Sequence, residues 1–389
     1  MQFAPKECAW EAPEGRPTRL GIDFRPALVN REGIGRVARE TVRALGAGEP
    51  AIRLRLFGAT LAAPRLAASE LDLPASARLF RVRVPSRIWR PLRRLTGLGA
   101  DDLLGGVDVF HHTQLNHLPV RRAIETATIF DTLYLDGGSG FVDPPTAARM
   151  ERHARALVER CARLQVPTEH VAHLVAAQLG ADPDRIDVVP LGCDHATRVT
   201  PDLGRTPRGP YLLTVARLDP RKNHVTVLRA FERLVAAGLP HRWIIAGPPG
   251  YRCDAIAAAL RDSPAADRIE WRRSVDEREL AALYADARLF AFPSLAEGFG
   301  LPPLEAMAHG CPVIASDEPV LNEVLGTAAV HIAPLDVDGW FEALREGLEL
   351  DRTPQREAAA RAHAAGWTWD QTAGAVQVQL GRLRSQTSS

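Results

Sequence analysis

The stretch Glu297-Gly298-Phe299-Gly300-Leu301-Pro302-Pro303-Leu304-Glu305 places two carboxylates eight positions apart, around a glycine turn and a proline pair. It follows the apolar run 289–293 and precedes Gly310. Proline is tolerated in a first helical turn because its missing N–H has no partner there, and glycine commonly follows a last turn. The stretch therefore predicts a strand, a Gly-rich loop and a short helix that stops at Gly310.

Such a junction is suited to binding an anion. Free backbone N–H groups and the positive end of the helix dipole point at one place, and Gly298 and Gly300 allow a ligand to approach the backbone closely. Glu297 lies at the loop's entrance and Glu305 about one turn into the helix, so hydroxyls on either side of a phosphate would meet a carboxylate. A nucleotide sugar has this constitution. The alternative is an ordinary strand–turn–helix with exposed acids.

A second segment carries cations that are also suited to binding a phosphate group. The apolar run 211–216 leads into Arg217, and Lys222 and Asn223 follow after a turn. Arginine offers a planar fork of donors and lysine a compact point charge, so together they can neutralise a diphosphate. The alternative is a solvated pair of cations.

These two segments resemble a known family. Residues 297–310, EGFGLPPLEAMAHG, are similar to the donor-site signature of family 4 glycosyltransferases, and the Arg217-x4-Lys222-Asn223 segment is similar to the strand-end motif of the same enzymes. The resemblance covers residues 18–380, specifically in the C-terminal half and loosely in the N-terminal half. It implies a retaining enzyme of the α/β GT-B fold, with two Rossmann-like domains facing a cleft and a C-terminal helix that crosses back to the first domain.

The resemblance also implies roles for individual residues. Glu297 would hold sugar hydroxyls and the positive charge near the anomeric carbon, and Glu305 would bind ribose. Ser274 and Val275, before the helical pattern 276–287, would hold the nucleobase through backbone groups. The donor-binding residues expected on this basis are Gly33, Gly35, Arg217, Lys222, Gly247, Ser274, Val275, Glu297, Gly298, Phe299, Gly300, Leu301 and Glu305. The expected catalytic residues are Glu297, Arg217, Lys222 and Asp131.

The N-terminal half contains a competing motif. Gly33-Ile34-Gly35-Arg36-Val37-Ala38 matches the dinucleotide fingerprint G-x-G-x-x-A, which would suggest a dehydrogenase. That fingerprint should follow its strand at once, and an acid should end the next strand. Here residues 25–32 intervene, and the run 53–57 ends without an acid. We expect the glycines to form a loop and helix start that face the cleft; a plain helix start is the alternative.

One departure from the family pattern concerns the transferred sugar. Similar enzymes often carry a His-Asp pair after the fourth strand, whereas this chain has Phe130-Asp131. The histidine contact is therefore in doubt, and Asp131 either faces the cleft or caps a turn. His111 and His112, just past the predicted strand 107–110, either line the cleft or are structural.

Apolar, β-branched runs alternate with helical patterns, which favours parallel α/β sheets. Strands are predicted at 20–24, 52–57, 107–110, 127–130 and 186–189 in one unit, and at 211–216, 243–246, 268–272, 289–292 and 313–315 in the other. The predicted division is a tail (1–17), an N-terminal acceptor domain (18–195), a linker (196–209), a donor domain (210–365) and a crossover helix with a tail (366–389).

Composition is ordinary for a globular protein: 46% apolar and 24% charged residues, with a formal charge of +1. At 389 residues, two domains are expected. The five cysteines form no CxxC pair, which favours a reduced cytosol without disulfides or zinc. No signal peptide and no spanning helix is expected. We also expect no metal, because neither Asp-x-Asp nor a His/Cys cluster is visible. The cysteines are Cys8, Cys161, Cys193, Cys253 and Cys311.

A basic and apolar stretch at 78–94 has no acid. It could lie on an anionic membrane, as a lipid-linked acceptor would require, or be a solvated surface or an acceptor-phosphate site. Nucleic-acid binding is disfavoured because no basic face extends it. Its arginines are Arg78, Arg81, Arg83, Arg87, Arg90, Arg93 and Arg94.

The expected protein is thus a hexosyltransferase that needs no cofactor and is either cytoplasmic or peripheral on the inner face of the membrane. It would use a UDP- or GDP-linked donor, with mannosyl or glucosyl transfer favoured, in cell-surface polysaccharide or glycoconjugate synthesis. A GT-B epimerase or phosphorylase and a non-catalytic nucleotide-sugar-binding protein are the alternatives.

Overall fold

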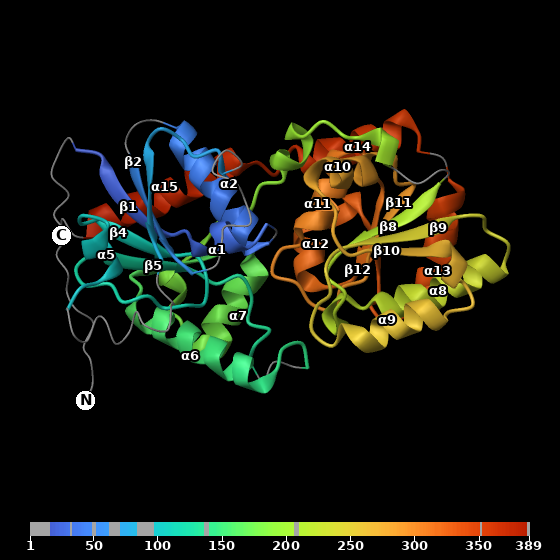
Figure 1. Cartoon of the computed structure of the whole chain (residues 1–389), viewed down its shortest axis with the longest axis horizontal. Coiled ribbons are helices and arrows are strands. Elements are labelled where there is room, and N and C mark those ends of the chain that lie inside the picture. Colours follow the sequence, from blue (N-terminus) through green and yellow to red (C-terminus); the bar gives the residue numbers. More distant parts are fainter. Residues whose placement is uncertain are drawn as a thin grey trace. The chain divides into compact units, whose positions relative to one another are not determined.

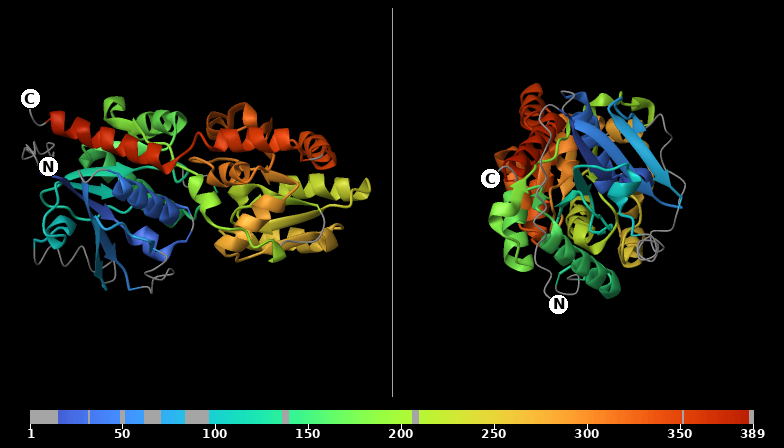
Figure 2. Two further views of the ribbon diagram at one scale, coloured as in Figure 1. Left: turned by 90° about the horizontal axis from the view of Figure 1, so that it is seen from above. Right: turned by 90° about the vertical axis from the view of Figure 1, so that its left-hand side faces the viewer.

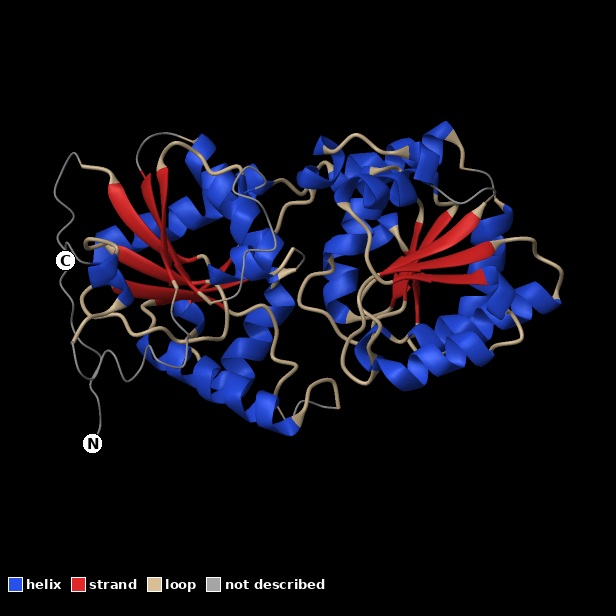
Figure 3. Cartoon of the chain, viewed as in Figure 1, coloured by secondary structure: helices blue, strands red, loops and turns tan. Residues whose placement is uncertain are grey.

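The computed structural model describes residues 16–31, 33–48, 52–61, 71–83, 97–135, 140–205, 210–350 and 352–386. The chain forms two compact units, each built on one parallel sheet flanked by helices (Figure 1, Figure 3). Within the described residues, the first unit runs to Thr132, continues over Pro145–Leu191 and ends with the segment from Trp369; the second comprises Leu133–Pro144 and Gly192–Thr368. The prediction of two Rossmann-like α/β domains is confirmed.

The sheet of the first unit has the order β3-β2-β1-β4-β5-β6-β7, and all its strand pairs are parallel. Its strands are β1 (Thr18–Asp23), β2 (Ile52–Ala59), β3 (Ala77–Val82), β4 (Val109–His112), β5 (Ile124–Thr128), β6 (Arg163–Val166) and β7 (Ile186–Val188). Its helices are α1 (Arg25–Val29), α2 (Ile34–Ala47), α5 (Ala100–Leu103), α6 (Pro144–Arg160), α7 (Glu169–Leu179), the 3-10 turn η2 (Pro183–Arg185) and α15 (Trp369–Gln386).

The sheet of the second unit has the order β10-β9-β8-β11-β12-β13. Its strands are β8 (Tyr211–Val215), β9 (Arg242–Ala246), β10 (Ile269–Arg272), β11 (Leu289–Phe292), β12 (Val313–Ser316) and β13 (Val330–Ile332). Its helices are α8 (His224–Ala236), α9 (Cys253–Asp262), α10 (Glu277–Asp286), α11 (Leu301–Ala308), α12 (Pro319–Leu325), α13 (Val337–Glu349) and α14 (Pro354–Ala364). Its 3-10 turns are η3 (Asp194–Arg198), η4 (Leu203–Arg205), η5 (Pro220–Lys222), η6 (Ala266–Arg268) and η7 (Gly326–Ala328).

Both sheets have a point where the strand order reverses. In the first unit it lies between β1 and β4, and in the second between β8 and β11. The connections that leave these neighbouring strands turn to opposite sides, which opens a crevice at the carboxyl ends of the strands where α/β proteins bind ligands. Fully buried Phe57 and Phe110 help to form a core of the first unit, and Trp243 and Trp340 that of the second.

The last helix, α15, belongs to the first unit, although the chain reaches it from the second (Figure 2). Thr372 donates a hydrogen bond to the carbonyl of Pro190 (2.7 Å), and Gln379 donates one to Asp187 (2.7 Å). Gln379 also accepts one from Gln165 of β6 (2.8 Å). Polar pairing between residues far apart in the chain thus attaches α15 to the sheet.

Several local predictions differ from the structure. β5 begins and ends earlier than the predicted strand 127–130, so Phe130 lies in the loop that follows it. His111 and His112 are part of β4 and do not follow it. The predicted list lacks β3, β6 and β13. The segment predicted as a linker, 196–209, contains part of η3 and all of η4, and its residues 206–209 lie outside the described residues.

Candidate functional site

The turns after β8 and β11 meet at the reversal point of the second sheet. Asn223 joins them: it adopts a left-handed conformation (φ 51°) before α8, and its side-chain amide donates to the carbonyls of Pro293 (3.1 Å) and Pro334 (2.7 Å). Asp219 accepts a hydrogen bond from the Lys222 amide (3.3 Å) and caps η5. The segment 219–223 is therefore held firmly beside the loop that carries Glu297.

Glu297 is paired with two cations. Its carboxylate accepts hydrogen bonds from the Lys222 ammonium and from Arg221 Nη1 (2.9 Å). Arg221 Nη1 also donates to the carbonyl of Ala296 (2.8 Å), and the Lys222 ammonium lies 4.8 Å from the centre of the Phe292 ring. Only 8% of the Glu297 side chain and 10% of that of Lys222 are exposed, so solvent screens the cluster weakly.

The electrostatics keep the cluster ionised. Burial alone would raise the pKa of Glu297, but the charges of Arg221 and Lys222 and the hydrogen bond from Lys222 lower its pKa to about 2. Burial and the neighbouring Arg221 lower the pKa of Lys222, while Glu297 opposes that shift. Asp219, at the start of the same turn, is a second carboxylate that acts on Lys222, so the cluster combines two cations with two carboxylates.

The glycine loop and α11 have the predicted form. Gly300 is left-handed (φ 90°), and a Cβ there would lie 2.7 Å from Leu321 Cδ2. α11 begins at Leu301 and ends at Ala308, shortly before the left-handed Gly310 (φ 77°). Gly298 is half-buried, and Phe299 is buried with its ring edge-on to that of Trp367 (5.4 Å). A rigid loop thus presents its backbone at the reversal point.

Glu305 lies in the interior, facing protein groups. It is 6% exposed, and its carboxylate accepts hydrogen bonds from His195 Nε2 (2.9 Å) and from the Tyr284 hydroxyl (2.8 Å). The ring of Tyr284 stacks on that of His309 (5.8 Å between centres). This network of α10, α11 and η3 holds the carboxylate in one orientation.

The other predicted donor residues border the same edge of the sheet. Arg217 is exposed, so it is Arg221 and not Arg217 that joins Lys222 at Glu297. Gly247 has φ 151°, and a Cβ there would lie 2.1 Å from the carbonyl oxygen of Ala216. Exposed Ser274 and half-buried Val275 precede α10, which Asp276 caps by accepting from the Glu279 amide (2.9 Å).

In the first unit, the two glycines of the G-x-G-x-x-A motif form the start of α2. Gly33 has φ 52°, and a Cβ at Gly35 would lie 2.1 Å from the carbonyl oxygen of Asn30. Residues 25–29, between the strand and the glycines, form α1, which accounts for most of their separation. Asp131 is half-buried in the loop after β5. The structure therefore groups Lys222, Glu297 and the glycine loop in one unit, and Gly33, Gly35 and Asp131 in the other.

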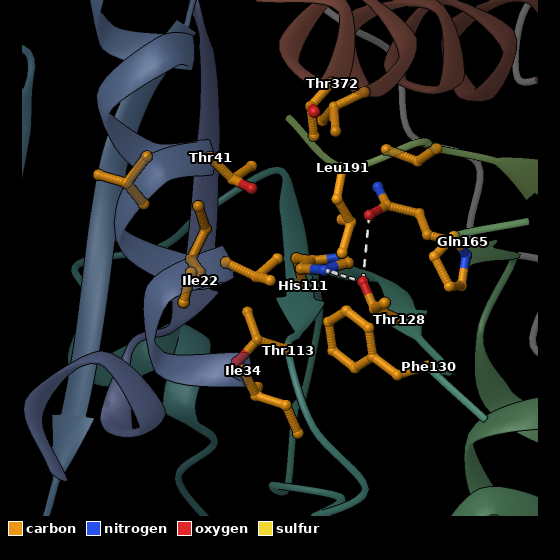
Figure 4. Close-up of a pocket in the computed structure, with 16 residues that line it drawn as sticks. Ile22, Ile34, Thr41, His111, Thr113, Thr128, Phe130, Gln165, Leu191 and Thr372 are labelled. Atoms are coloured by element: carbon orange, nitrogen blue, oxygen red, sulfur yellow. Dashed lines mark hydrogen bonds between the residues drawn. The ribbon is translucent and has the colours of Figure 1, made fainter. Parts of the chain in front are cut away.

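A pocket adjoins α2 at the reversal point of the first sheet (Figure 4). Ile22 of β1, His111 of β4 and Phe130 line it. His111 is hydrogen-bonded through Nδ1 to Thr126 Oγ1 and through Nε2 to Thr128 Oγ1, both at 3.0 Å. Burial, then the neighbouring His112, lowers the pKa of His111 to about 3, so its ring is neutral at physiological pH.

The sequence analysis did not identify one group of side chains that could hold a metal ion, formed by His112, His117 and Glu125; the expectation that the protein needs no metal stays a prediction. The Nε2 atoms of His112 and His117 lie 3.0 and 3.1 Å from the same carboxylate oxygen of Glu125, a spacing that could hold a metal ion. The other carboxylate oxygen accepts from Arg160 Nε (3.1 Å) and Nη2 (2.5 Å). Both oxygens of the Glu125 carboxylate thus have hydrogen-bond partners within the protein.

Two residues of interest escaped the sequence analysis. Arg221 sits next to Lys222, and its adjacency in the Arg-Lys-Asn run was the available signal. Asp23 ends β1 and is 1% exposed, with its carboxylate accepting from Gln114 Nε2 (3.0 Å) and the Arg25 amide (3.2 Å). Burial raises its pKa against these hydrogen bonds. No sequence signal marks Asp23 beyond its place at a strand end.

Two further expectations concern surfaces. Of the stretch 78–94, residues 78–82 belong to β3, and residues 84–96 lie outside the described residues, as do the N-terminal residues 1–15 with Cys8. Cys161, Cys193, Cys253 and Cys311 are free thiols. Among the helices that the structure describes, none has the length and apolar character needed to cross a membrane.

Comparisons with known proteins find similarity in sequence and in structure. Residues 209–349 match the family model described as glycosyl transferases group 1. The chain is similar over 95% of its length to the solved sucrose-phosphate synthase of Thermosynechococcus elongatus, of which it covers 99%, with a TM-score of 0.73 and 18% identity. The fold is GT-B.

Curated relatives are more similar in sequence but differ in length. The chain is 31% identical over 249 residues to a D-inositol 3-phosphate glycosyltransferase of Nocardia farcinica, covering 59% of this chain and 55% of that protein. It is 34% identical over 169 residues to the serotype-specific mannosyltransferase WbdA of Escherichia coli, covering 42% of this chain and 20% of that protein. The chain thus matches about half of the first relative's length and a fifth of the second's.

Proposed function

We propose that this chain is a retaining, metal-independent glycosyltransferase of family 4 that transfers a hexosyl unit from a nucleotide sugar. One observation carries the proposal: the buried Glu297 carboxylate, paired with Lys222 and Arg221 at the reversal point of the sheet and followed by the Gly298–Gly300 loop. This arrangement sets two cations and the amides of the glycine loop beside a carboxylate that can accept hydrogen bonds from hydroxyls.

The proposed reaction follows from the charges. The bond between the anomeric carbon and the leaving phosphate oxygen breaks, and the diphosphate charge that develops is stabilised by Arg221, Lys222 and the loop amides, with Arg217 at the rim. Preorganised charges of this kind are usually the largest catalytic contribution. The acceptor hydroxyl attacks the same face of the sugar, and its proton passes to the departing phosphate oxygen. Glu297 binds sugar hydroxyls and stabilises the developing oxocarbenium ion.

The remaining assignments are finer. We propose that Glu305 binds the ribose, that Ser274 and Val275 bind the base of a UDP- or GDP-linked donor, and that Gly33, Gly35 and Asp131 contact the transferred sugar. We propose mannosyl or glucosyl transfer in cell-surface polysaccharide or glycoconjugate synthesis, and the name of one relative, a serotype-specific mannosyltransferase, supports the mannosyl option. The acceptor is a glycan, a lipid-linked sugar or a small molecule. The enzyme would act in the cytoplasm, with peripheral membrane contact through 78–94.

A thermal-shift panel tests the donor site. UDP, GDP, ADP and dTDP and their common sugars are added to the full chain with and without EDTA. We expect one nucleotide to raise the melting temperature, equally in EDTA. A shift that disappears in EDTA would contradict metal independence, and no shift with any nucleotide would contradict a donor site.

A product assay separates transfer from the alternatives. The stabilising nucleotide sugar is incubated with a panel of acceptors, and the anomeric configuration of the product is read by NMR. We expect a new glycoside with the donor's configuration. Conversion of the free sugar alone would indicate an epimerase, and binding without any turnover would indicate a non-catalytic protein.

A further inference from the structure

The pocket beside α2 in the first unit has a mostly apolar and uncharged lining, unlike the charged cluster around Glu297 in the second unit. Ten of its sixteen lining residues are apolar, and none of the sixteen carries a formal charge at neutral pH (Figure 4). The walls come from α2, from the carboxyl ends of the strands around the reversal point and from α15. The cavity measures about 40 Å³. A water needs roughly 10–15 Å³, so the cavity takes the terminal carbons of an alkyl chain or the edge of an aromatic ring, and not the whole of a larger group.

The polar groups of the lining are already engaged with the protein. Thr128 donates to Gln165 (3.2 Å) in addition to its contact with His111. Thr113 donates to the carbonyl of Asp23 (2.6 Å), and Thr372 to that of Pro190 (2.7 Å). The remaining polar lining residue is Thr41 of α2, so the walls have little hydrogen-bonding capacity left for a ligand.

This chemistry disfavours sugars and phosphates as occupants. A sugar buried there would lose its hydrogen bonds to water and find few replacements, and a phosphate would meet no cation. An apolar group gains from leaving water in proportion to its buried area, and a cavity with a fixed, uncharged lining needs no desolvation of ions to accept it.

We propose that this cavity binds the uncharged, apolar aglycone of the acceptor: an alkyl or aromatic group attached to the sugar that receives the hexosyl unit. The inference rests on the proposed function, since it names the acceptor class of that reaction. The cavity lies at the carboxyl ends of β1, β4 and β5, where ligands of α/β sheets bind, and the start of α2 at Ile34 forms part of its wall. Hydrocarbon chains and aromatic rings share the required chemistry.

Binding is tested first, without any donor. Hexyl, p-nitrophenyl and methyl α-mannosides are compared on the full chain by saturation-transfer NMR and titration. We expect the hexyl or the p-nitrophenyl glycoside to bind at least tenfold more tightly than the methyl glycoside. The first outcome identifies an alkyl and the second an aromatic aglycone. Equal binding of all three would overturn the proposal.

Variants localise the binding. Val37→Phe fills the cavity from α2, and Ala47→Phe adds the same ring at an exposed position on the same helix. We expect Val37→Phe to weaken binding at least tenfold and Ala47→Phe to leave it unchanged. Circular dichroism and the melting temperature, both measured without ligand, check that each variant is folded. Unchanged binding in a folded Val37→Phe variant would overturn the assignment.

Transfer distinguishes the two proposals. If the wild-type chain glycosylates the hexyl or p-nitrophenyl glycoside in preference to the methyl glycoside, both hold. If it glycosylates all three equally, the proposed function stands and the aglycone site fails. If the apolar glycosides bind through Val37 but no donor supports transfer to anything, the proposed function fails and the cavity is a binding site without the acceptor role.

Discussion

The two units share one topology and use its reversal point in opposite ways. At the carboxyl ends of β8 and β11, the second unit gathers Lys222, Arg221 and Glu297, all ionised and held by one another. At the corresponding place between β1 and β4, the first unit has a neutral histidine, hydroxyls paired with protein groups and an apolar wall. The sheet determines where a ligand can bind, and the turns determine which chemistry it meets.

Among the substitutions that test this difference between the two units, we expect Glu297→Gln to have the largest effect on turnover. Glu297→Gln removes the anion between buried Lys222 and half-buried Arg221, and it removes the charge proposed to stabilise the oxocarbenium ion. We expect turnover to fall about a hundredfold to a thousandfold, since a single preorganised group can supply roughly 3–4 kcal/mol. The measurement is the rate of glycoside formation at saturating donor. Glu346→Gln, at an exposed site on α13, is the matched control, and near-normal turnover in Glu297→Gln would refute the role.

The cations provide a finer comparison. Arg221 and Arg217 both follow β8, but only Arg221 contacts Glu297, whereas Arg217 is exposed. We expect Arg221→Met to lower kcat/KM about a hundredfold, because it disrupts a buried pair, and Arg217→Met to lower it about tenfold or less. Both variants are measured with the same donor. An equal or larger loss for Arg217→Met would show that Arg217 moves onto the diphosphate when the donor binds, and it would contradict the greater role assigned to Arg221.

The neutral, buried His111 of the first unit predicts that the stability of the protein depends on pH. The pKa of His111 is about 3 in the folded chain, well below its ordinary value near 6.5. Between these values the unfolded chain binds more protons at this residue, so its contribution to stability is present above pH 6.5 and is lost as the pH falls. His111→Gln removes that dependence. From pH 6.5 to 5, we expect the wild type to lose about 2 kcal/mol more than the variant.

Denaturant unfolding at the two pH values measures this difference. His224 has its pKa lowered to about 3 by burial, then by Lys222, and lies in the second unit, so it titrates in both proteins and cancels. A wild-type curve parallel to that of His111→Gln over this range would contradict a neutral, buried His111.

The sequence predicted most reliably where local signals and fold agree. The strand at 289–292, the glycine turn and the short α11 all follow from apolar runs, prolines and glycines in one continuous stretch. β6 was missed because its Arg163 and Gln165 read as exposed, whereas both are buried against Asp187 and Gln379, 24 and 214 residues away. Edge strand β3 carries two arginines and was taken for a basic surface.

In the candidate site, too, some features follow from local sequence and others depend on residues far apart in the chain. Lys222, Glu297 and the glycines were predicted, because their spacing within two short segments is visible in the sequence. The choice of Arg221 over Arg217 depends on the 3-10 turn that orients them, and the orientation of Glu305 depends on His195, 110 residues away. The pocket beside α2 combines residues from four strands, two helices and several loops, which no local pattern reveals.

The smallest expected effect concerns Glu305. This residue lies in the second unit, which also holds the charged cluster around Glu297, and its carboxylate is held by His195 and Tyr284. His195 Nε2 and the Tyr284 hydroxyl each bond one carboxylate oxygen, so they fix its orientation while leaving lone pairs for a ribose. We expect His195→Ala to raise KM for the nucleotide sugar about tenfold with kcat nearly unchanged, as for a positioning residue that acts through binding. His195→Gln, which can still donate, should restore most of the affinity. The decisive comparison uses a 2′- or 3′-deoxyribose donor: if His195 acts through the ribose contact, the penalty of His195→Ala disappears with one of them, whereas a purely structural defect would penalise every donor alike.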